Sequence, residues 1–368
     1  LSGCQSTGLF FAEKKQETNH EKTSLELIPV PEETIVTAEA TTKKEPEPVQ
    51  LTPQEQDDLW QRIRQQLVFD VPNVQRVQSQ RNWYASHPEY LDRVAKRAEP
   101  YLHLIVEELE RREMPIDLAL LPIVESAFDP FAYSHGSASG VWQFIPGTAR
   151  QYGLDINWWY DGRRDVFAAT HAALDYLEAL YRYFDGNWMH ALAAYNSGEG
   201  RVGNAIRRNK RAGKPTDFWN LDLPRETRAY VPKLLALADI LANSEKYGIT
   251  WYPIENQPML EVVEAPAQID LALAADMADL SLEELHQFNS GYNRWATAPD
   301  GPHRFLLPAE NAERFSLALQ ETEPKDWLSW TRHKVKSGES LLTISKKYNT
   351  FVNIYKQCTV KYTTLGIN

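Results

Sequence analysis

One glutamate stands out among the residues that could perform acid–base chemistry. Glu125 follows the apolar run LLPIV at 120–124 and precedes Ser126. Burial of a carboxylate costs free energy, so such a group tends to keep its proton towards neutral pH. The helical pattern over 117–126 also places Glu125 near a helix C-terminus, where the helix dipole opposes ionisation. A protonated Glu125 could therefore act as a general acid, for example towards a glycosidic oxygen.

A glycosidase ordinarily needs a second carboxylate as nucleophile or base. Four candidates lie in the same part of the chain: Asp129, Asp161, Asp165 and Glu199. Asp129 precedes a proline, which is typical of a turn, and Asp165 has the position of a helix N-cap. No acid stands out as the partner of Glu125.

Several classes of function are disfavoured by composition. The net charge is -11 and the isoelectric point is near 5.4, so nucleic acid is not expected as a partner. The nine histidines show no metal-ligand spacing, and no glycine-rich phosphate loop is present. We therefore expect neither a metal nor a cofactor. The small residues Ser137, Ala138, Ser139 and Gly140 suit a loop over a groove better than a nucleophile elbow.

The elements that must position Glu125 are predicted to be helices. A capping box at 52–55 opens the folded region, and Ser86 with Pro88 marks a second helix start. Helical spacing continues over 101–112, 117–126, 146–152, 165–184, 188–195 and 227–246. Glycines at 153, 186, 198 and 248 mark helix ends. The region 52–250 is therefore predicted to be one all-helical domain.

Two smaller modules are predicted after this domain. The region 251–325 has the order strand, helix, helix, strand, with strands near 260–263 and 305–308, and Ser281 caps the second helix. The region 326–368 opens with a similar pattern and resembles the LysM domain, a small α+β glycan-binding fold, through Val335, Gly338, Leu341, Ile344 and Tyr348. Its pattern stops near Asn349, so we expect this LysM to be incomplete. The 251–325 module resembles a degenerate relative of it.

The N-terminal residues predict a membrane anchor. LSGC at 1–4 resembles the lipobox of bacterial lipoproteins, in which the cysteine is acylated, so Cys4 is the expected lipidation site. The chain is expected to begin inside its own signal peptide. Residues 5–51, rich in Glu, Lys, Thr and Pro, are predicted to be a disordered tether. Gln5 after the cysteine predicts sorting to the outer membrane, with the protein facing the periplasm.

Three separate motifs resemble those of the lytic murein transglycosylases with a lysozyme-like fold, glycoside hydrolase family 23. They are Glu125-Ser126, GVWQ at 140–143 and AYNSG at 194–198. The resemblance implies that Glu125 is catalytic. It further implies substrate-binding or acid-supporting roles for Ser134, Gln143, Tyr195, Asn196 and Tyr230. Trp142 stands where most relatives have Met and is a further candidate for contact with a sugar. An alternative for Tyr195 is a core aromatic residue whose hydroxyl group is satisfied internally.

The resemblance also implies a reaction that needs no second carboxylate. The 6-hydroxyl of N-acetylmuramic acid attacks its own C1, and Glu125 serves first as acid and then as base. The implied substrate is peptidoglycan, cleaved between N-acetylmuramic acid and N-acetylglucosamine by a monomeric, lipid-anchored enzyme. The implied role is cell-wall turnover. The alternatives are a muramidase-type hydrolase that uses water and a non-catalytic peptidoglycan-binding lipoprotein. The LysM-like segments are expected to add affinity for the wall but no chemistry.

Overall fold

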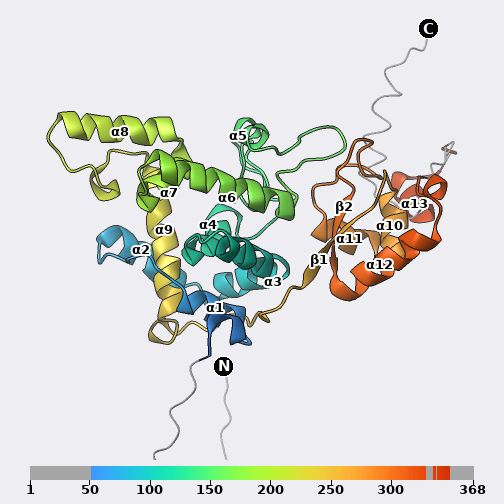
Figure 1. Cartoon of the computed structure of the whole chain (residues 1–368), viewed down its shortest axis with the longest axis horizontal. Helices are drawn as coiled ribbons and strands as arrows, with labels where there is room; N and C mark the ends of the chain where they lie inside the picture. Colours follow the sequence, from blue (N-terminus) through green and yellow to red (C-terminus); the bar gives the residue numbers. More distant parts are fainter. Residues whose placement is uncertain (1–50, 329–334, 337, 349–368) are drawn as a thin grey trace, which may run out of the picture. The chain divides into compact units, whose positions relative to one another are not determined.

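The computed structural model describes residues 51–328, 335–336 and 338–348, and helices dominate the first two hundred of them (Figure 1). Six helices lead up to the catalytic candidate and the loop beyond it: η1 (Pro53–Glu55), α1 (Leu59–Gln65), α2 (Gln75–Ala85), α3 (Pro88–Arg111), η2 (Ile116–Leu120) and α4 (Leu121–Ser126). The remaining helices of this region are α5 (Pro146–Gln151), α6 (Val166–Tyr183), α7 (Trp188–Ser197), α8 (Glu199–Arg211), η3 (Phe218–Asn220), α9 (Arg225–Ala242) and η4 (Glu245–Tyr247). The predicted all-helical character is confirmed.

The helix α3 is longer than the sequence pattern indicated. The helix start at Pro88 and the pattern over 101–112 belong to one helix, which continues through Pro100. A regular apolar stripe holds it together, because its buried residues recur every three or four positions: Leu91, Val94, Ala95, Ala98, Tyr101, Leu102, Ile105, Val106 and Leu109. Burial of that stripe outweighs the single backbone hydrogen bond that a proline removes.

Three α-helices were not predicted from the sequence: α2, α8 and α12 (Ala309–Glu321). Each is polar and buries few side chains. Val77 and Tyr84 are the buried residues of α2, and Ala312 and Phe315 are those of α12. With so few apolar residues, these segments were not recognised as helices in the sequence, and tertiary packing supplies most of the stability of such a helix.

The predicted capping box at Thr52 forms, but on a different element. The Glu55 carboxylate accepts hydrogen bonds from the backbone N–H and the hydroxyl of Thr52, at 2.9 and 2.8 Å. These residues close the 3₁₀ turn η1, whereas α1 begins later and is capped by Asp58, which accepts a hydrogen bond from Trp60 N. The helix start was therefore placed several residues too early.

The helices pack in pairs around a shared core. In Figure 1, α2 runs beside α9 and α6 beside α7, and α7 also contacts α8 and α9. The largest fully buried side chains of this core include Trp60, Trp142, Phe128 and Phe218. Burial of such rings supplies much of the hydrophobic stabilisation and holds α4, α7 and α9 in fixed positions.

The next region has the predicted order of strand, two helices and strand. Strands β1 (Leu260–Glu264) and β2 (Arg304–Pro308) pair in antiparallel register, with Val262 opposite Leu306. Between them lie α10 (Leu271–Met277) and α11 (Leu282–Phe288), and the capping box at the start of α11 is present, with Glu284 N donating to Ser281 Oγ. Phe305 and Phe315 anchor a second buried cluster. The predicted fold class, mainly α with a small α+β module, is confirmed.

The module is joined to the helical region by direct hydrogen bonds. Asp161 N donates to Gly291 O and Asn293 N to Trp159 O, each at 2.8 Å. Arg304 on β2 forms an ion pair with Asp165 at 2.7 Å, and both side chains are largely buried. The loop that precedes α6 therefore rests on residues of the α+β module.

Several sequence predictions fall on residues that are not described. Cys4 and the predicted tether, apart from Leu51, lie outside the described residues. Of the predicted LysM at 326–368, the described elements are the end of η5 (Pro324–Asp326) and α13 (Leu341–Lys347), which is capped by Ser340 and contains the predicted Ile344. Among the described helices, none has the length and apolar character required to cross a bilayer.

Candidate active site

The Glu125 side chain lines a cavity with a volume of about 800 Å³. The residues that line it come from the helices α4 to α9 and from the loop between α4 and α5. All six predicted residues are among them: Glu125, Ser134, Gln143, Tyr195, Asn196 and Tyr230. The fold therefore brings together residues that are up to 105 positions apart in the chain.

Local structure fixes the position of Glu125. It is the penultimate residue of α4, which stops because Ala127 and Phe128 adopt left-handed backbone angles, with φ of 53° and 56°. Phe128 is fully buried and pins the chain beyond the helix. Ser126 Oγ donates to Val141 O at 2.9 Å, so the residue after the catalytic candidate ties the first motif to the second.

The environment lets the Glu125 carboxyl keep its proton at a much higher pH than an exposed glutamate does. Burial raises its pKa from 4.5 to about 7, and the negative charge of Glu226 acts in the same direction. A hydrogen bond from Tyr230 and the positive charge of Lys233 partly oppose this rise. A carboxyl with such a pKa can both donate and accept a proton at physiological pH.

The two tyrosines have different roles. Tyr230 on α9 donates its hydroxyl hydrogen to Oε1 of Glu125. Tyr195 on α7 instead donates to the backbone carbonyl of Trp142 at 2.9 Å. Burial holds the pKa of both phenols well above its usual value, so both remain neutral hydrogen-bond donors. Tyr195 thus lines the cavity and is only partly buried, while its hydroxyl group is satisfied internally.

Asn196 is oriented by a residue that the sequence motifs did not single out. Thr227 at the start of α9 is buried, and its hydroxyl donates to Oδ1 of Asn196 at 2.8 Å. Because Oδ1 accepts this bond, the two N–H groups of the amide remain available as donors. Thr227 also lines the cavity.

Ser134 and Gln143 lie on the loop between α4 and α5. Nε2 of Gln143 donates to Gly140 O at 2.8 Å, and the Ser134 hydroxyl oxygen accepts from Ala138 N at 3.0 Å. Both side chains therefore shape the loop as well as line the cavity. This loop is called the substrate loop below, residues 129–144.

A buried ion pair holds the substrate loop in place. Arg163 binds Asp161 through two hydrogen bonds, of 2.9 and 2.7 Å, and donates to Ser137 O at 2.6 Å. Gly140 lies so close to Arg163 that a Cβ atom at this position would be 1.7 Å from the Arg163 carbonyl oxygen. Arg163 was missed in the sequence because no local pattern marks its contact with a loop 26 residues away.

Trp142 corrects one prediction. Its side chain is fully buried, donates from Nε1 to the Thr170 hydroxyl at 2.9 Å, and is not among the residues that line the cavity. The indole therefore does not contact a sugar in the cleft, and it packs in the core because it is large and apolar. Its backbone carbonyl is the part that serves the site, as the acceptor for Tyr195.

The structure shows which of the candidate second carboxylates lie near Glu125. Asp129 accepts a hydrogen bond from Phe131 N, as expected for a turn, Asp161 is paired with Arg163, and Asp165 caps α6. The described carboxylates that line the cavity with Glu125 are Glu199 and Glu226. Glu226 was overlooked, although its position four residues before Tyr230 placed both on one face of the helix.

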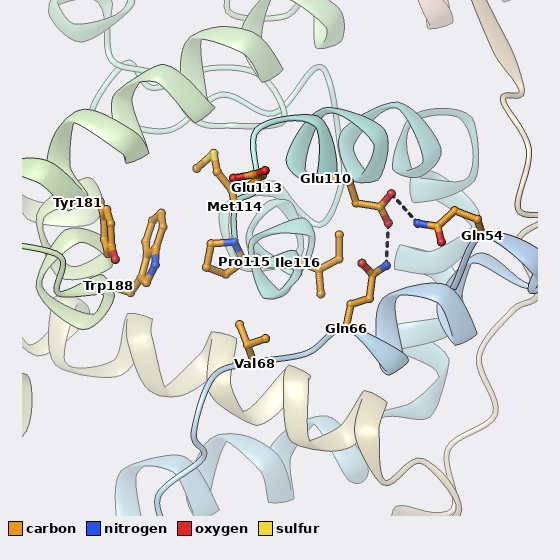
Figure 2. A pocket seen from close by; sticks show the side chains of 10 residues that line it. All are labelled: Gln54, Gln66, Val68, Glu110, Glu113, Met114, Pro115, Ile116, Tyr181 and Trp188. Carbon is orange, nitrogen blue, oxygen red and sulfur yellow. Dashed lines mark hydrogen bonds between the residues drawn. The ribbon is translucent and has the colours of Figure 1, made fainter. Parts of the chain in front are cut away.

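A second concavity, about 510 Å³ in volume, contains Glu110, whose carboxyl group differs from that of Glu125 (Figure 2). Gln54 and Gln66 both donate to the Glu110 carboxylate, as the dashed lines show, and Arg62 forms an ion pair with it. Burial acts to raise the pKa of Glu110, but the hydrogen bonds from Arg62 and Gln66 outweigh it and the pKa is lowered. This carboxylate is therefore ionised at neutral pH and cannot donate a proton.

Comparison with known proteins assigns the family. The model described as "Transglycosylase SLT domain" matches residues 104–218, and that described as "Lytic transglycosylase MltD, LysM-like domain" matches residues 259–323. Membrane-bound lytic murein transglycosylase D of Escherichia coli (strain K12) is 43% identical over 300 residues, which are 79% of this chain and 66% of that protein. The chain belongs to the lytic transglycosylases with an SLT domain.

Two further comparisons cover smaller parts of the chain. A putative tributyltin chloride resistance protein of Alteromonas sp. (strain M-1) is 49% identical over 138 residues, which are 36% of this chain and 67% of that one. The structure of an inactive mutant of the lytic transglycosylase Slt from Pseudomonas aeruginosa covers 51% of this chain and 32% of its own, with 23% identity and a TM-score of 0.33. The chain spans 66% of the length of the first curated relative.

The cavity contains residues on both sides of the end of the family match. Glu125, Gln143 and Tyr195 lie within residues 104–218, whereas Glu226, Thr227 and Tyr230 on α9 lie beyond them. Among the described residues, no group of three or more His, Cys, Asp or Glu side chains could hold a metal ion.

Proposed function

We propose that this chain is a peptidoglycan lytic transglycosylase, with Glu125 as its catalytic acid and base. The observation that carries the proposal is a partly buried carboxyl with a pKa of about 7, hydrogen-bonded by Tyr230, in a cavity large enough for sugar residues. Membership of the SLT family supports the reaction type.

The reaction proceeds in two proton transfers. Protonated Glu125 donates its proton to the glycosidic oxygen as the bond from C1 of N-acetylmuramic acid to O4 of N-acetylglucosamine breaks. The 6-hydroxyl of the same muramoyl residue then bonds to C1, and ionised Glu125 accepts its proton. The products are a free 4-hydroxyl and a 1,6-anhydro ring, and Glu125 returns to its starting state. The nucleophile is tethered to the reacting carbon, which gives it a high effective molarity.

Other residues of the cavity position the strand and the acid. Tyr230 orients the Glu125 carboxyl and stabilises its ionised form. Asn196, held by Thr227, presents amide N–H groups that suit the carbonyl oxygen of an N-acetyl group. Ser134 and Gln143 lie on the substrate loop, and their side chains face the cavity in which the glycan strand would bind.

Product mass tests the proposal directly. Purified glycan strands are digested and the new ends are analysed by mass spectrometry. A transglycosylase yields anhydromuramoyl ends, which are lighter by one water than the reducing ends of a hydrolase. Glu199 or Glu226 would have to activate that water in a hydrolase. Reducing ends as the main product would refute the transglycosylase reaction, and no new ends at all would favour a binding protein.

We further propose that the protein is a monomer anchored to the outer membrane through an acylated Cys4, with the LysM-like modules adding affinity for the insoluble wall. The lipobox-like LSGC supports the anchor, and the name of the E. coli relative includes membrane attachment. Full-length precursor carrying Cys4→Ala is expected in the soluble fraction after cell lysis. Sedimentation of this variant with membranes would argue against lipidation.

A further inference from the structure

A basic groove continues the active-site cavity. It has a volume of about 910 Å³ and is lined by Arg201, Asn204, Arg208 and Arg211 of α8 with residues 222–224 opposite. Arg201 and Pro224 line both hollows, so the groove and the active-site cavity meet at these two residues. A strand bound at Glu125 therefore has this groove next to it.

The four α8 residues form one stripe. Their spacing of three, four and three positions places them on a single face of the helix. The rest of α8 adds Arg207 and Lys210, whereas its one acidic residue is Glu199. Such a concentration of positive charge is unusual in a chain whose net charge is -11. The groove therefore attracts anions although the protein as a whole repels them.

Helix stability explains only part of this stripe. Arg208 and Arg211 lie in the last turn of α8, where cations interact favourably with the helix dipole. Arg201 lies in the first turn, where a cation is disfavoured, and it is exposed. Its guanidinium group forms no hydrogen bond or ion pair with any residue that the structure describes. Arg201 therefore does not stabilise the fold, but it could bind a negatively charged ligand.

The existing ion pair in the groove is too weak to neutralise it. Arg208 approaches Asp222 at 3.6 Å, but both side chains are largely exposed. Exposed pairs of this kind contribute little free energy, and their partners exchange readily. Arg208 also donates to Asp222 O at 3.2 Å, in an equally exposed contact. Its guanidinium group can therefore turn to a carboxylate that Arg211 binds as well, since charge-assisted hydrogen bonds are stronger.

We propose that the stripe of Arg201, Arg208 and Arg211 binds the carboxylates of the peptide stems carried by the glycan strand. This inference rests on the proposed function. The sugar backbone of a stem-bearing strand is uncharged, because the lactyl carboxyl of each muramoyl residue is consumed in the amide bond to its peptide. Arginines beside a sugar cleft thus have no charged partner on the sugars. The stems supply one, since they contain acidic residues and end in a free carboxylate.

The test compares three substrates: strands with uncrosslinked stems, the same strands with their carboxylates converted to carboxamides, and strands without stems. The variant is the double change Arg208→Gln and Arg211→Gln, which leaves the residues of the catalytic cavity unaltered. Arg182→Gln is the matched control, because Arg182 is an exposed arginine of α6 and is paired only weakly with Glu178.

We expect the parent to have a KM for stem-bearing strands about five-fold below that for amidated or stem-free strands, which corresponds to about 1 kcal/mol from two exposed charge contacts. In the double variant this difference should shrink to about two-fold or less. The control should behave as the parent. A preference for stem-bearing strands that persists in the double variant, or that survives amidation in the parent, would overturn the inference.

Two further measurements separate stem binding from a failure of the proposed reaction and from binding of a lipid phosphate. Equilibrium binding is measured at 4 °C in the Glu125→Gln background, and the strands are checked for new ends afterwards, so loss of stem-dependent binding through the arginines is detected even if the proposed reaction is wrong. Anhydromuramoyl ends from stem-free strands test the reaction without the groove. Sedimentation with phosphatidylglycerol vesicles tests a lipid phosphate as the ligand. Vesicle binding that depends on Arg208 and Arg211, with KM values unchanged, would contradict binding of stems.

Discussion

At the scale of single residues, the site depends on one ionisable group. Glu125→Gln removes the proton that the mechanism moves, while the amide is nearly isosteric and its oxygen can still accept the hydrogen bond from Tyr230. Loss of acid–base catalysis typically lowers a rate by about 10²–10⁴-fold. Because Glu125 serves both proton transfers, we expect a loss towards the upper end, measured as anhydromuramoyl ends released per minute. Near-parent activity in a normally folded variant would rule out Glu125 as the acid.

The same substitution changes the pH dependence of stability. The pKa of Glu125 rises from an ordinary 4.5 to about 7 on folding, so the unfolded state loses this proton first as pH increases. The free energy of unfolding therefore falls between about pH 4.5 and 7, by on the order of 3 kcal/mol from this group. Glu125→Gln has no ionisable group at this position, so its free energy of unfolding does not fall in this way. Measured by urea unfolding at pH 8, the variant should be more stable than the parent. Equal stabilities at pH 4 and a gap at pH 8 are the expected pattern.

Neighbouring charges should shift the alkaline limb of the activity profile. Activity requires protonated Glu125, so kcat/KM is expected to fall above about pH 7. Lys233→Met removes a charge that lowers the Glu125 pKa, and Glu226→Gln removes one that raises it. The limb should move to higher pH in the first variant and to lower pH in the second. Shifts in the same direction, or none, would show that another group controls the profile.

At the scale of elements, the substrate loop owes its position to the chain that precedes α6. Gly140 has φ of 82°, and a Cβ atom there would meet the Arg163 carbonyl oxygen at 1.7 Å. Gly140→Ala must therefore displace the loop that carries Ser134 and Gln143. We expect a lower melting temperature and at least a ten-fold loss of kcat/KM, about 1.4 kcal/mol or more in transition-state stabilisation.

Gly147→Ala is the matched control for this change. Gly147 lies in α5, and a Cβ atom there would have no neighbour within 4 Å. Alanine in place of glycine in an unstrained helix commonly stabilises by about 0.5–1 kcal/mol. This variant should keep parent activity with an equal or higher melting temperature. Similar losses in both variants would mean that the substrate loop does not depend on its contact with Arg163.

At the scale of the whole molecule, the α+β module and the catalytic region share a structural contact. Arg304 on β2 pairs with Asp165, which also caps α6. Arg304→Gln leaves this largely buried carboxylate without its counter-charge and should destabilise the protein by about 1–3 kcal/mol, a fall of roughly 2–10 °C in melting temperature. Arg314→Gln breaks an exposed pair with Asp279 and should change it by less than about 2 °C. Equal effects of the two variants would show that the contact does not stabilise the fold.

Local sequence was sufficient for the acid and for most of the helices near it. The apolar run before Glu125 predicted a raised pKa for its carboxyl group. Burial of a carboxylate disfavours ionisation whichever apolar surface the run packs against. Broad apolar stripes predicted the second half of α3 and most of α6 and α9, and the helix stop at Gly198 appears as a φ of 84°. These features depend on neighbours within one or two turns of the chain, and so they can be recognised without a fold.

Long-range packing decided the rest. The hydrogen bond from Tyr230 to Glu125 spans 105 residues, and the contact of Arg163 with Ser137 joins two loops whose order in the chain does not predict their proximity. Trp142 was a further candidate for contact with a sugar, because nothing in a motif distinguishes a buried indole from one that lines a cleft. Glu226 and the arginines of α8 became part of the cavity and its groove only when α8 and α9 packed against α7. The free energy of such contacts depends on which surfaces meet in three dimensions, and that information is not contained in the spacing of residues along the chain.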